Sequence, residues 1–277
     1  MSFSVVTNLA SLNAQAQLGK TGISLDKAIG RLTSGLRINT AADDAAGMAI
    51  ANRHKLDYSG LQTGIRSAND AISKLQIEDG AMSNIASLLD RALTLSAQAA
   101  SDTFLGDRDI LQTELDSVVA EIDRTAKAAG VDASGAAIAD QKVFVGNTQI
   151  LDDDDTVTYV TIDALAAGVD ASGLAVAGLD ISDQSGAAAA VTAIQEAIST
   201  LGVSQGQIGS GMTRLQFAIS QAETLSVNVA AAESRLRDAN MAEEASNLTK
   251  YNILTQSGIA ALAQANNVPG AVLRLLQ

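Results

Sequence analysis

The 277 residues contain no cysteine, no tryptophan, one proline and one histidine. Without cysteine there is no disulfide framework, and a single histidine, His54, excludes a histidine-based metal cluster or catalytic dyad. Aromatic residues make up only 3% of the chain, so alanine, leucine, isoleucine and valine must form the apolar core. This composition is typical of long helices packed side by side, and it gives an enzyme little support.

Long apolar runs are also missing. No run approaches the roughly 18 residues that span a bilayer, which predicts a chain that is not inserted into a membrane. The N-terminal stretch MSFSVVTNLASLNAQ has neither the basic region nor the continuous apolar segment of a secretory signal. If the protein leaves the cell, we expect a dedicated export route.

Acidic residues dominate, with a net charge of −13 that argues against non-specific binding of nucleic acid. The charge is uneven, because Gly130–Ser185 holds ten aspartates and a single basic residue, Lys142. Both ends of the chain are mildly basic. We therefore expect the middle to face water and the ends to face protein.

Apolar or small residues recur in Glu233–Gln277 at alternating spacings of four and three, the pattern of a helix that packs lengthwise on another helix. Pro269 predicts the end of this helix near Val268, because the residue before proline avoids the helical region. An apolar tip follows it. The stripe comprises Met241, Ala245, Leu248, Asn252, Thr255, Ile259, Leu262 and Asn266, and the tip contains Val272, Leu273, Leu275 and Leu276.

A similar stripe near the N-terminus predicts the partner helix, with Leu9 and Leu12 on an adjacent stripe. Two amphipathic ends of similar length indicate an antiparallel pair, with the rest of the chain inserted between them. Because isolated helices are marginal in water, we expect both ends to be largely disordered in the monomer and to fold on docking. The N-terminal stripe comprises Ala14, Leu18, Gly22, Leu25, Ile29, Leu32 and Leu36.

Between the ends, capping and periodicity predict further helices and one β-hairpin. Thr40 and Asp43 resemble a capping box. Two copies of GVDASG, at 130–135 and 168–173, are interpreted as turns. The predicted helices are about Thr7–Leu36, Asp43–Ser101, Asp107–Ala129 and Asp183–Ala232, the last interrupted at Gly202–Gly211, and the predicted strands are Val143–Leu151 and Thr156–Ile162.

Several local patterns invite a functional interpretation that the chain does not support. Asp152–Asp155 lacks the spacing and central glycine of a calcium loop and is predicted to be a solvated turn. Gly206, Gly209 and Gly211 have the wrong spacing for a phosphate loop and predict a helix irregularity. Asn247–Thr249 matches a glycosylation acceptor but lies in a predicted packed helix. No catalytic, cofactor-binding or metal-ligating residue is predicted.

Two longer motifs carry a family resemblance. Arg31–Arg53 reads RLTSGLRINTAADDAAGMAIANR and the last residues read LAQANNVPGAVLRLLQ. Both resemble the terminal signatures of bacterial flagellin, and the resemblance covers Met1–Ala129 and Asp183–Gln277. The short middle resembles that of a compact flagellin without large outer domains. Ala129–Gly130–Val131 stands where the family often has a Phe-Asn-Gly turn.

The resemblance implies a mostly α fold with a terminal antiparallel coiled coil, an elongated helical bundle and a small β-hairpin region in the middle of the chain. The corresponding domains would be 1–42 with 235–277, 43–129 with 183–234, and 130–182. The residues implied in assembly through the terminal coiled coil are Leu9, Leu12, Leu18, Leu25, Ile29, Leu32, Leu36, Leu248, Ile259, Leu262, Leu273 and Leu276.

The implied function is that of a structural, non-enzymatic subunit that assembles with copies of itself into the flagellar filament for swimming. It would be extracellular, exported without a cleaved signal peptide and without a cofactor. The resemblance also implies hook-associated proteins, a cap protein, the export apparatus and an export chaperone as partners.

A further implied partner is the animal Toll-like flagellin receptor, because Arg91, Leu95 and Glu114 match its contact positions. Thr94 replaces the usual acidic neighbour, so weak or absent signalling is expected, and contacts between neighbouring subunits are the favoured role. Two other functions stay open on the sequence: a hook–filament junction protein, and an adhesin or enzyme using the same export route.

Overall fold

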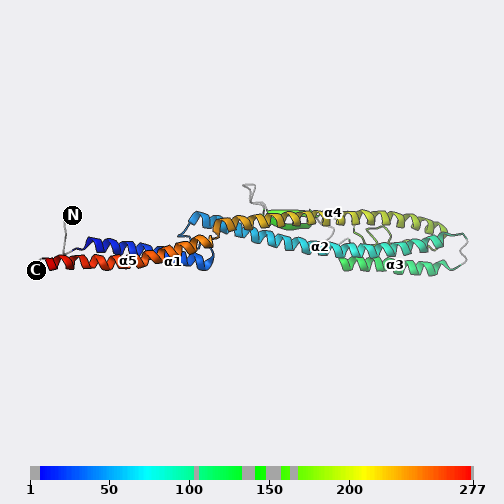
Figure 1. The fold of residues 1–277 in the computed structure, drawn as a ribbon. Coiled ribbons are helices and arrows are strands. Elements are labelled where there is room, and N and C mark those ends of the chain that lie inside the picture. The colour runs from blue at the N-terminus through cyan, green and yellow to red at the C-terminus, as the bar shows by residue number, and fades with distance from the viewer. Residues whose placement is uncertain (1–6, 103–105, 133–140, 148–156, 163–167, 276–277) are drawn as a thin grey trace. The chain divides into compact units, whose positions relative to one another are not determined.

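The structure is a computed structural model that describes residues 7–102, 106–132, 141–147, 157–162 and 168–275 (Figure 1). It divides into unit 1, Met1–Leu56 with Asn228–Gln277, and unit 2, Asp57–Val227. The mostly α architecture with a single described hairpin confirms the predicted fold class. The elements are α1 (Leu9–Ser34), α2 (Ala45–Ala100), α3 (Arg108–Ala129), β1 (Gln141–Asn147), β2 (Val157–Ile162), α4 (Gln184–Arg237) and α5 (Met241–Leu275).

Unit 1 is built on the antiparallel pair of α1 and α5, which lie side by side (Figure 1). Asn8 caps the start of α1 by accepting a hydrogen bond from the Ser11 amide, and Gly35 ends that helix in the left-handed conformation with φ of 72°. The segments that follow α1 and α4 meet in a short antiparallel bridge between Leu36 and Asp238. The predicted pairing of the two ends is therefore present within one chain.

The start of α2 differs in detail from the predicted capping box. The Asp43 carboxylate accepts hydrogen bonds from the Thr40 amide at 3.0 Å and the Thr40 hydroxyl at 2.9 Å, as a reaching-back acidic residue would. The cap itself is Asp44, whose carboxylate accepts from the Gly47 amide at 2.9 Å. Thr40 belongs to the turn before the helix, and the helix begins at Ala45.

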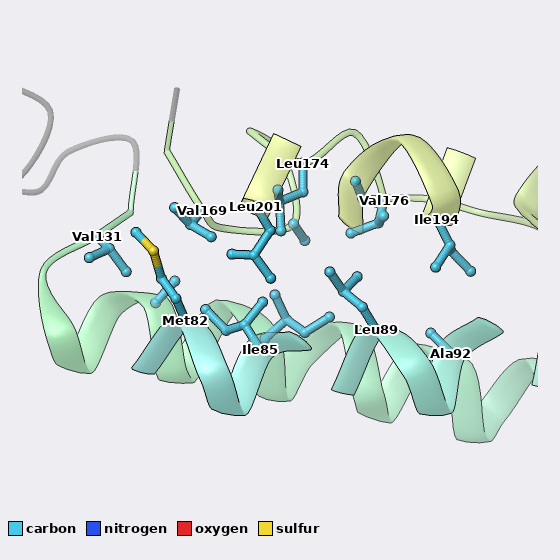
Figure 2. Close-up of a cluster of buried hydrophobic side chains, with 14 of the residues drawn as sticks. Met82, Ile85, Leu89, Ala92, Val131, Val169, Leu174, Val176, Ile194 and Leu201 are labelled. Carbon is cyan, nitrogen blue, oxygen red and sulfur yellow. The ribbon is translucent and has the colours of Figure 1, made fainter. Parts of the chain in front are cut away.

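Unit 2 is held together by an aliphatic core shared by α2, α3, α4 and the segment from Val169 to Ile181. Met82, Ile85 and Leu89 of α2 project toward Leu201 and Ile194 of α4 (Figure 2). All five side chains are almost completely buried. Each helix contributes one apolar stripe, as their periodicity requires.

The β-hairpin lies against the helices where glycine allows close approach. A Cβ on Gly64 of α2 would lie only 2.2 Å from the carbonyl atoms of Val145, and one on Gly211 of α4 would lie 3.1 Å from Ile162. β1 and β2 pair antiparallel, with a register shift between Phe144 and Gly146. The hairpin thus docks partly by backbone contact.

The chain enters and leaves the hairpin region at one point. The Val169 amide donates to the Val131 carbonyl at 2.8 Å, and both side chains are buried. These valines belong to the two GVDASG copies, so the repeated hexapeptide joins the two ends of this region. Gln112 of α3 fixes the following segment by donating to the Leu179 carbonyl and accepting from the Ile181 amide.

Two helix predictions are wrong. The predicted interruption at Gly202–Gly211 is absent, because α4 is continuous through these glycines while Leu201 and Ile208 keep its apolar stripe in the core. Pro269 does not end α5, which continues to Leu275. Proline within a helix removes one backbone donor and crowds the carbonyl four residues earlier, which disfavours the helix at that point without excluding it.

Several predictions fall outside the described residues, namely the Asp152–Asp155 turn, the end of the first GVDASG copy and Leu276.

One described helix, α4, is long and apolar enough by length and composition alone to cross a membrane, which the sequence prediction did not anticipate. Its most apolar 18-residue window has a mean hydropathy of 1.2 and is 28% buried. In the structure, one face of α4 packs into the core of unit 2.

Candidate assembly surfaces

The contact between α1 and α5 follows two stripes in which small residues and leucines both recur. In each helix, buried or half-buried positions recur at alternating spacings of three and four, as in a coiled coil. Leu18 reaches Gly258 so closely that a Cβ there would lie 3.0 Å from the leucine. Small residues let the backbones approach. The stripes are Ser11, Ala14, Leu18, Thr21, Leu25, Ala28 and Leu32 in α1, and Glu244, Leu248, Tyr251, Thr255, Gly258, Leu262 and Ala265 in α5.

These stripes are rotated relative to the predicted ones. Leu18, Leu25, Leu32, Leu248 and Leu262 are half-buried, as a helix-facing role requires. Other predicted positions do not face the partner helix in this chain. Ile29 is 45% exposed and Ile259 is 55% exposed, while Leu36 lies in the bridge beyond α1. Leu273 lies within α5, and Leu276 is outside the described residues.

Large apolar side chains therefore remain on the outer faces of the pair. Leu9 is 70% exposed and Leu12 is 57% exposed, and both lie on the same side of α1. Helices that carry apolar residues on more than one face are normally buried in a larger structure. The exposed set in unit 1 is Leu9, Leu12, Ile23, Ile29, Ile50, Leu56, Met241, Ile253, Leu254 and Ile259.

A cavity of about 350 Å³, lined by several charged residues, lies beside α1, between that helix and the Asn39–Asp43 turn. Its cationic side chains have acidic partners, because Lys27 lies 4.0 Å from Asp43 and Arg31 lies 3.2 Å from Glu244 of α5. The hydrogen bonds from Thr40 hold the pKa of Asp43 below its ordinary value. These charges join neighbouring elements of unit 1, and the cavity lacks the arrangement of nucleophile and base that catalysis needs.

A buried carboxylate lies in unit 2. Glu78 of α2 is only 2% exposed, and its Oε1 atom has no hydrogen-bond partner. Burial raises the pKa of Glu78, while Lys74, 3.8 Å away, opposes part of that rise. A charged group in an apolar core costs stability unless it is fully paired. Glu78 lies three residues after Leu75 and four before Met82, so the spacing of the α2 stripe could have marked it as buried, but the sequence prediction followed only apolar side chains.

The three residues matched to the receptor positions do not share a surface. Arg91 and Glu114 are exposed and bind each other across α2 and α3 through charge-assisted hydrogen bonds. Leu95 is 2% exposed and belongs to the core of unit 2. The Leu95 side chain is thus not available to a partner in this structure.

Features expected of an enzyme or metalloprotein are sparse. Among the described residues, no three His, Cys, Asp or Glu side chains gather to hold a metal ion. A second cavity, of about 230 Å³, lies between the hairpin and the helices of unit 2 and is lined mainly by apolar groups such as Leu61, Val160 and Leu225. The outer apolar faces of α1 and α5 are therefore the candidate site considered for function.

Comparison with known proteins agrees with the geometry. Residues 5–141 match the family Bacterial flagellin N-terminal helical region, and residues 191–276 match the Bacterial flagellin C-terminal helical region. A flagellin of Halalkalibacterium halodurans is 36% identical, with 98% of each chain covered.

Two further relatives cover 98% of this chain. The flagellar filament 33 kDa core protein of Treponema phagedenis is 33% identical over 98% of its own length. A flagellin of Listeria monocytogenes is 34% identical over 99% of its own length. The crystal structure of Bacillus cereus flagellin is 24% identical, covers 61% of this chain and 94% of its own, and has a TM-score of 0.47.

Paired terminal helices with uncovered apolar faces define a helical structural protein. Both family regions match, and close relatives extend over almost the whole chain. The chain belongs to the bacterial flagellin family.

Proposed function

We propose that this chain is the repeating structural subunit of a bacterial flagellar filament and serves swimming motility. The observation that carries the proposal is the row of large apolar side chains left uncovered on α1 and α5. Burying an exposed leucine or isoleucine contributes about 1.5–3 kcal/mol. Contact with the same helices of other copies would bury these residues and fix the pair in place.

Seeded growth tests this function. Purified chain is added to sheared filament fragments and examined by electron microscopy, with long filaments as the expected result. The Ile259→Ser variant should grow at least tenfold more slowly, because it places a hydroxyl where an apolar contact is needed. The matched control is Gln256→Ser, an exposed polar position on the same helix, which should grow at close to the wild-type rate.

Two outcomes contradict the proposal. Absence of growth by the wild-type chain, or short caps that stop after a few subunits, would favour the hook–filament junction protein. Normal growth by Ile259→Ser would show that the outer face of α5 is not the assembly surface. The names of the relatives favour the filament subunit, since nothing found favours a junction protein.

The proposal extends to location and to partners. The subunit would reach the cell exterior through the flagellar export apparatus, without a cleaved signal peptide and with an export chaperone, and would meet hook-associated and cap proteins at the filament ends. It would act without catalysis, cofactor, nucleic acid or membrane insertion. The family's structural character supports this.

Recognition by an innate immune receptor has less support. Arg91 and Glu114 are already paired with each other, and Leu95 is buried. We assign the Arg91–Glu114 pair to the surface where α2 and α3 face a neighbouring subunit, and we expect weak or absent receptor activation.

A further inference from the structure

Pro269 creates a defined defect in α5. In an α-helix the amide of each residue donates to the carbonyl four residues earlier, so the donor for the Ala265 carbonyl would be residue 269. Proline has no amide hydrogen, and Pro269 is the only proline in the chain. The helix nevertheless runs from Met241 to Leu275. The Ala265 carbonyl is therefore left without its helical donor, at a half-buried position that faces α1.

Asn8 supplies the missing donor. Its side-chain Nδ2 donates to the Ala265 carbonyl at 2.8 Å, across 257 residues of sequence. The Oδ1 atom of the same amide accepts from the Ser11 backbone amide at 3.1 Å, which caps α1. One side chain thus satisfies an unpaired amide at the start of α1 and an unpaired carbonyl in α5. An unpaired buried polar group would be costly at either place.

We infer that Asn8 and Pro269 together form a register lock that holds the N-terminal end of α1 opposite one particular turn of α5. Both contact stripes repeat with coiled-coil spacing, and the leucines in them recur at that same repeat, so packing alone discriminates weakly between registers shifted by one repeat. The proline marks one carbonyl as unpaired. In a shifted register, Asn8 would face a carbonyl that already has a donor, and Ala265 would have none.

Contacts elsewhere hold the opposite end of the pair. Arg31 binds Glu244 at 3.2 Å, and Leu36 forms the bridge with Asp238. Leu18 lies on Gly258 between the two ends. All of these contacts agree with a single antiparallel register. Asn8 is then the positioning residue for the end of α1 that lies farthest from the bridge.

A double-mutant cycle separates the lock from simple helix capping. Asn8→Asp keeps an oxygen that can cap α1 but has no hydrogen to donate to Ala265. Pro269→Ala restores the backbone donor for the Ala265 carbonyl. The lock predicts that Asn8→Asp is harmful when residue 269 is proline and nearly harmless when it is alanine.

The measurement is hydrogen exchange of the α1 amides in the full-length chain. It is made both in assembled polymer and in monomer. The comparison of variants uses whichever of the two samples protects these amides in the wild-type chain. Asn8→Asp should accelerate exchange over Leu9–Leu18 about tenfold, the worth of one hydrogen bond. In the Pro269→Ala background the same change should have less than about a threefold effect. Pro269→Ala alone should be at least as protected as the wild-type chain.

Two controls sharpen the test. Asn8→Ser also keeps a capping oxygen, is uncharged and is too short to reach Ala265, so it should repeat the pattern of Asn8→Asp. Asn13→Ser, at an exposed asparagine of the same helix, should behave alike in both backgrounds.

Three results would overturn the lock. The first is that Asn8→Asp accelerates exchange equally with proline and with alanine at position 269. The second is that Asn8→Asp accelerates exchange and Asn8→Ser does not. The third is that Pro269→Ala alone loses protection. The measurement in polymer rests on the proposed function, because it requires that the chain assembles. Failure of the wild-type chain to assemble counts against that function, whereas an additive cycle in protected helices counts against the lock.

Discussion

Single residues decide how closely the elements of unit 2 approach. Gly64 and Gly60 lie one turn apart on α2, yet their surroundings differ completely. A Cβ on Gly64 would overlap the backbone of Val145 and Gly146, whereas one on Gly60 would meet nothing within 4 Å. Gly64 is therefore required by the hairpin, and Gly60 only weakens the helix.

This contrast gives a matched pair of substitutions. Gly64→Ala should lower the free energy of unfolding of unit 2 by several kcal/mol, because the obstructing atoms are backbone and cannot rotate away. Gly60→Ala should raise it by up to about 1 kcal/mol through helix propensity. Urea unfolding followed by circular dichroism measures both. Equal effects of the two substitutions would show that the hairpin does not dock on Gly64.

Glu78 gives a pH dependence with a definite sign. Its folded-state pKa lies above the ordinary value of 4.5 because burial disfavours the charged form. The folded state therefore binds the proton more readily than the unfolded chain does. The cost of burying the charge is present above the folded-state pKa and disappears as the pH falls through it toward 4.5.

Comparison with Glu78→Gln isolates this effect from all other titrating groups. The variant should exceed the wild-type chain in stability by more at neutral pH than near pH 4.5. Thermal unfolding across this pH range measures the difference. A stability difference that stays constant with pH would show that the pKa of Glu78 is the same in the folded and unfolded states.

At the scale of elements, α1 is weakly anchored within its own chain. Only Thr21 and Ala28 are buried among its 26 residues. Segments with so few buried contacts open readily. In monomer, we expect the amides of α1 and α5 to exchange within about tenfold of unprotected rates, while the core of α2 exchanges far more slowly. Strong protection at Ile29 and Leu262 in the monomer would contradict this expectation.

The elements also show how far sequence reasoning extends. Spacing placed α1, α2 and α3 to within about two residues and paired the two strands of the hairpin, because these features are local. The sequence prediction failed where the local structure depends on a contact with a segment far away in the sequence. Gly211 remains helical against Ile162, and Asn8 finds its partner 257 residues away. The predicted α5 stripe included Ile259 because isoleucine is more hydrophobic than glycine, although Gly258 is the residue that contacts Leu18.

At the scale of the molecule, the two units differ in how much apolar surface they bury. Unit 2 buries a continuous aliphatic core shared by three helices and a loop segment, so it has the contacts to be stable alone. Unit 1, which is built on the pair of α1 and α5, leaves large apolar side chains exposed, so under the proposed function its stability would depend on neighbouring subunits. The proposed function thus assigns stability of the fold to unit 2 and assembly to unit 1.

The hydrogen bond between Val131 and Val169 has a consequence for how such a chain can change in length. The two ends of the hairpin region meet at this hydrogen bond, so the helices on either side need not move when the chain between them grows, provided that β1 and β2 keep their contacts with α2 and α4. Doubling the length of a flexible loop costs only about 0.6 kcal/mol in closure entropy. Additional segments of considerable length could therefore be inserted there without rearranging the helices of unit 2.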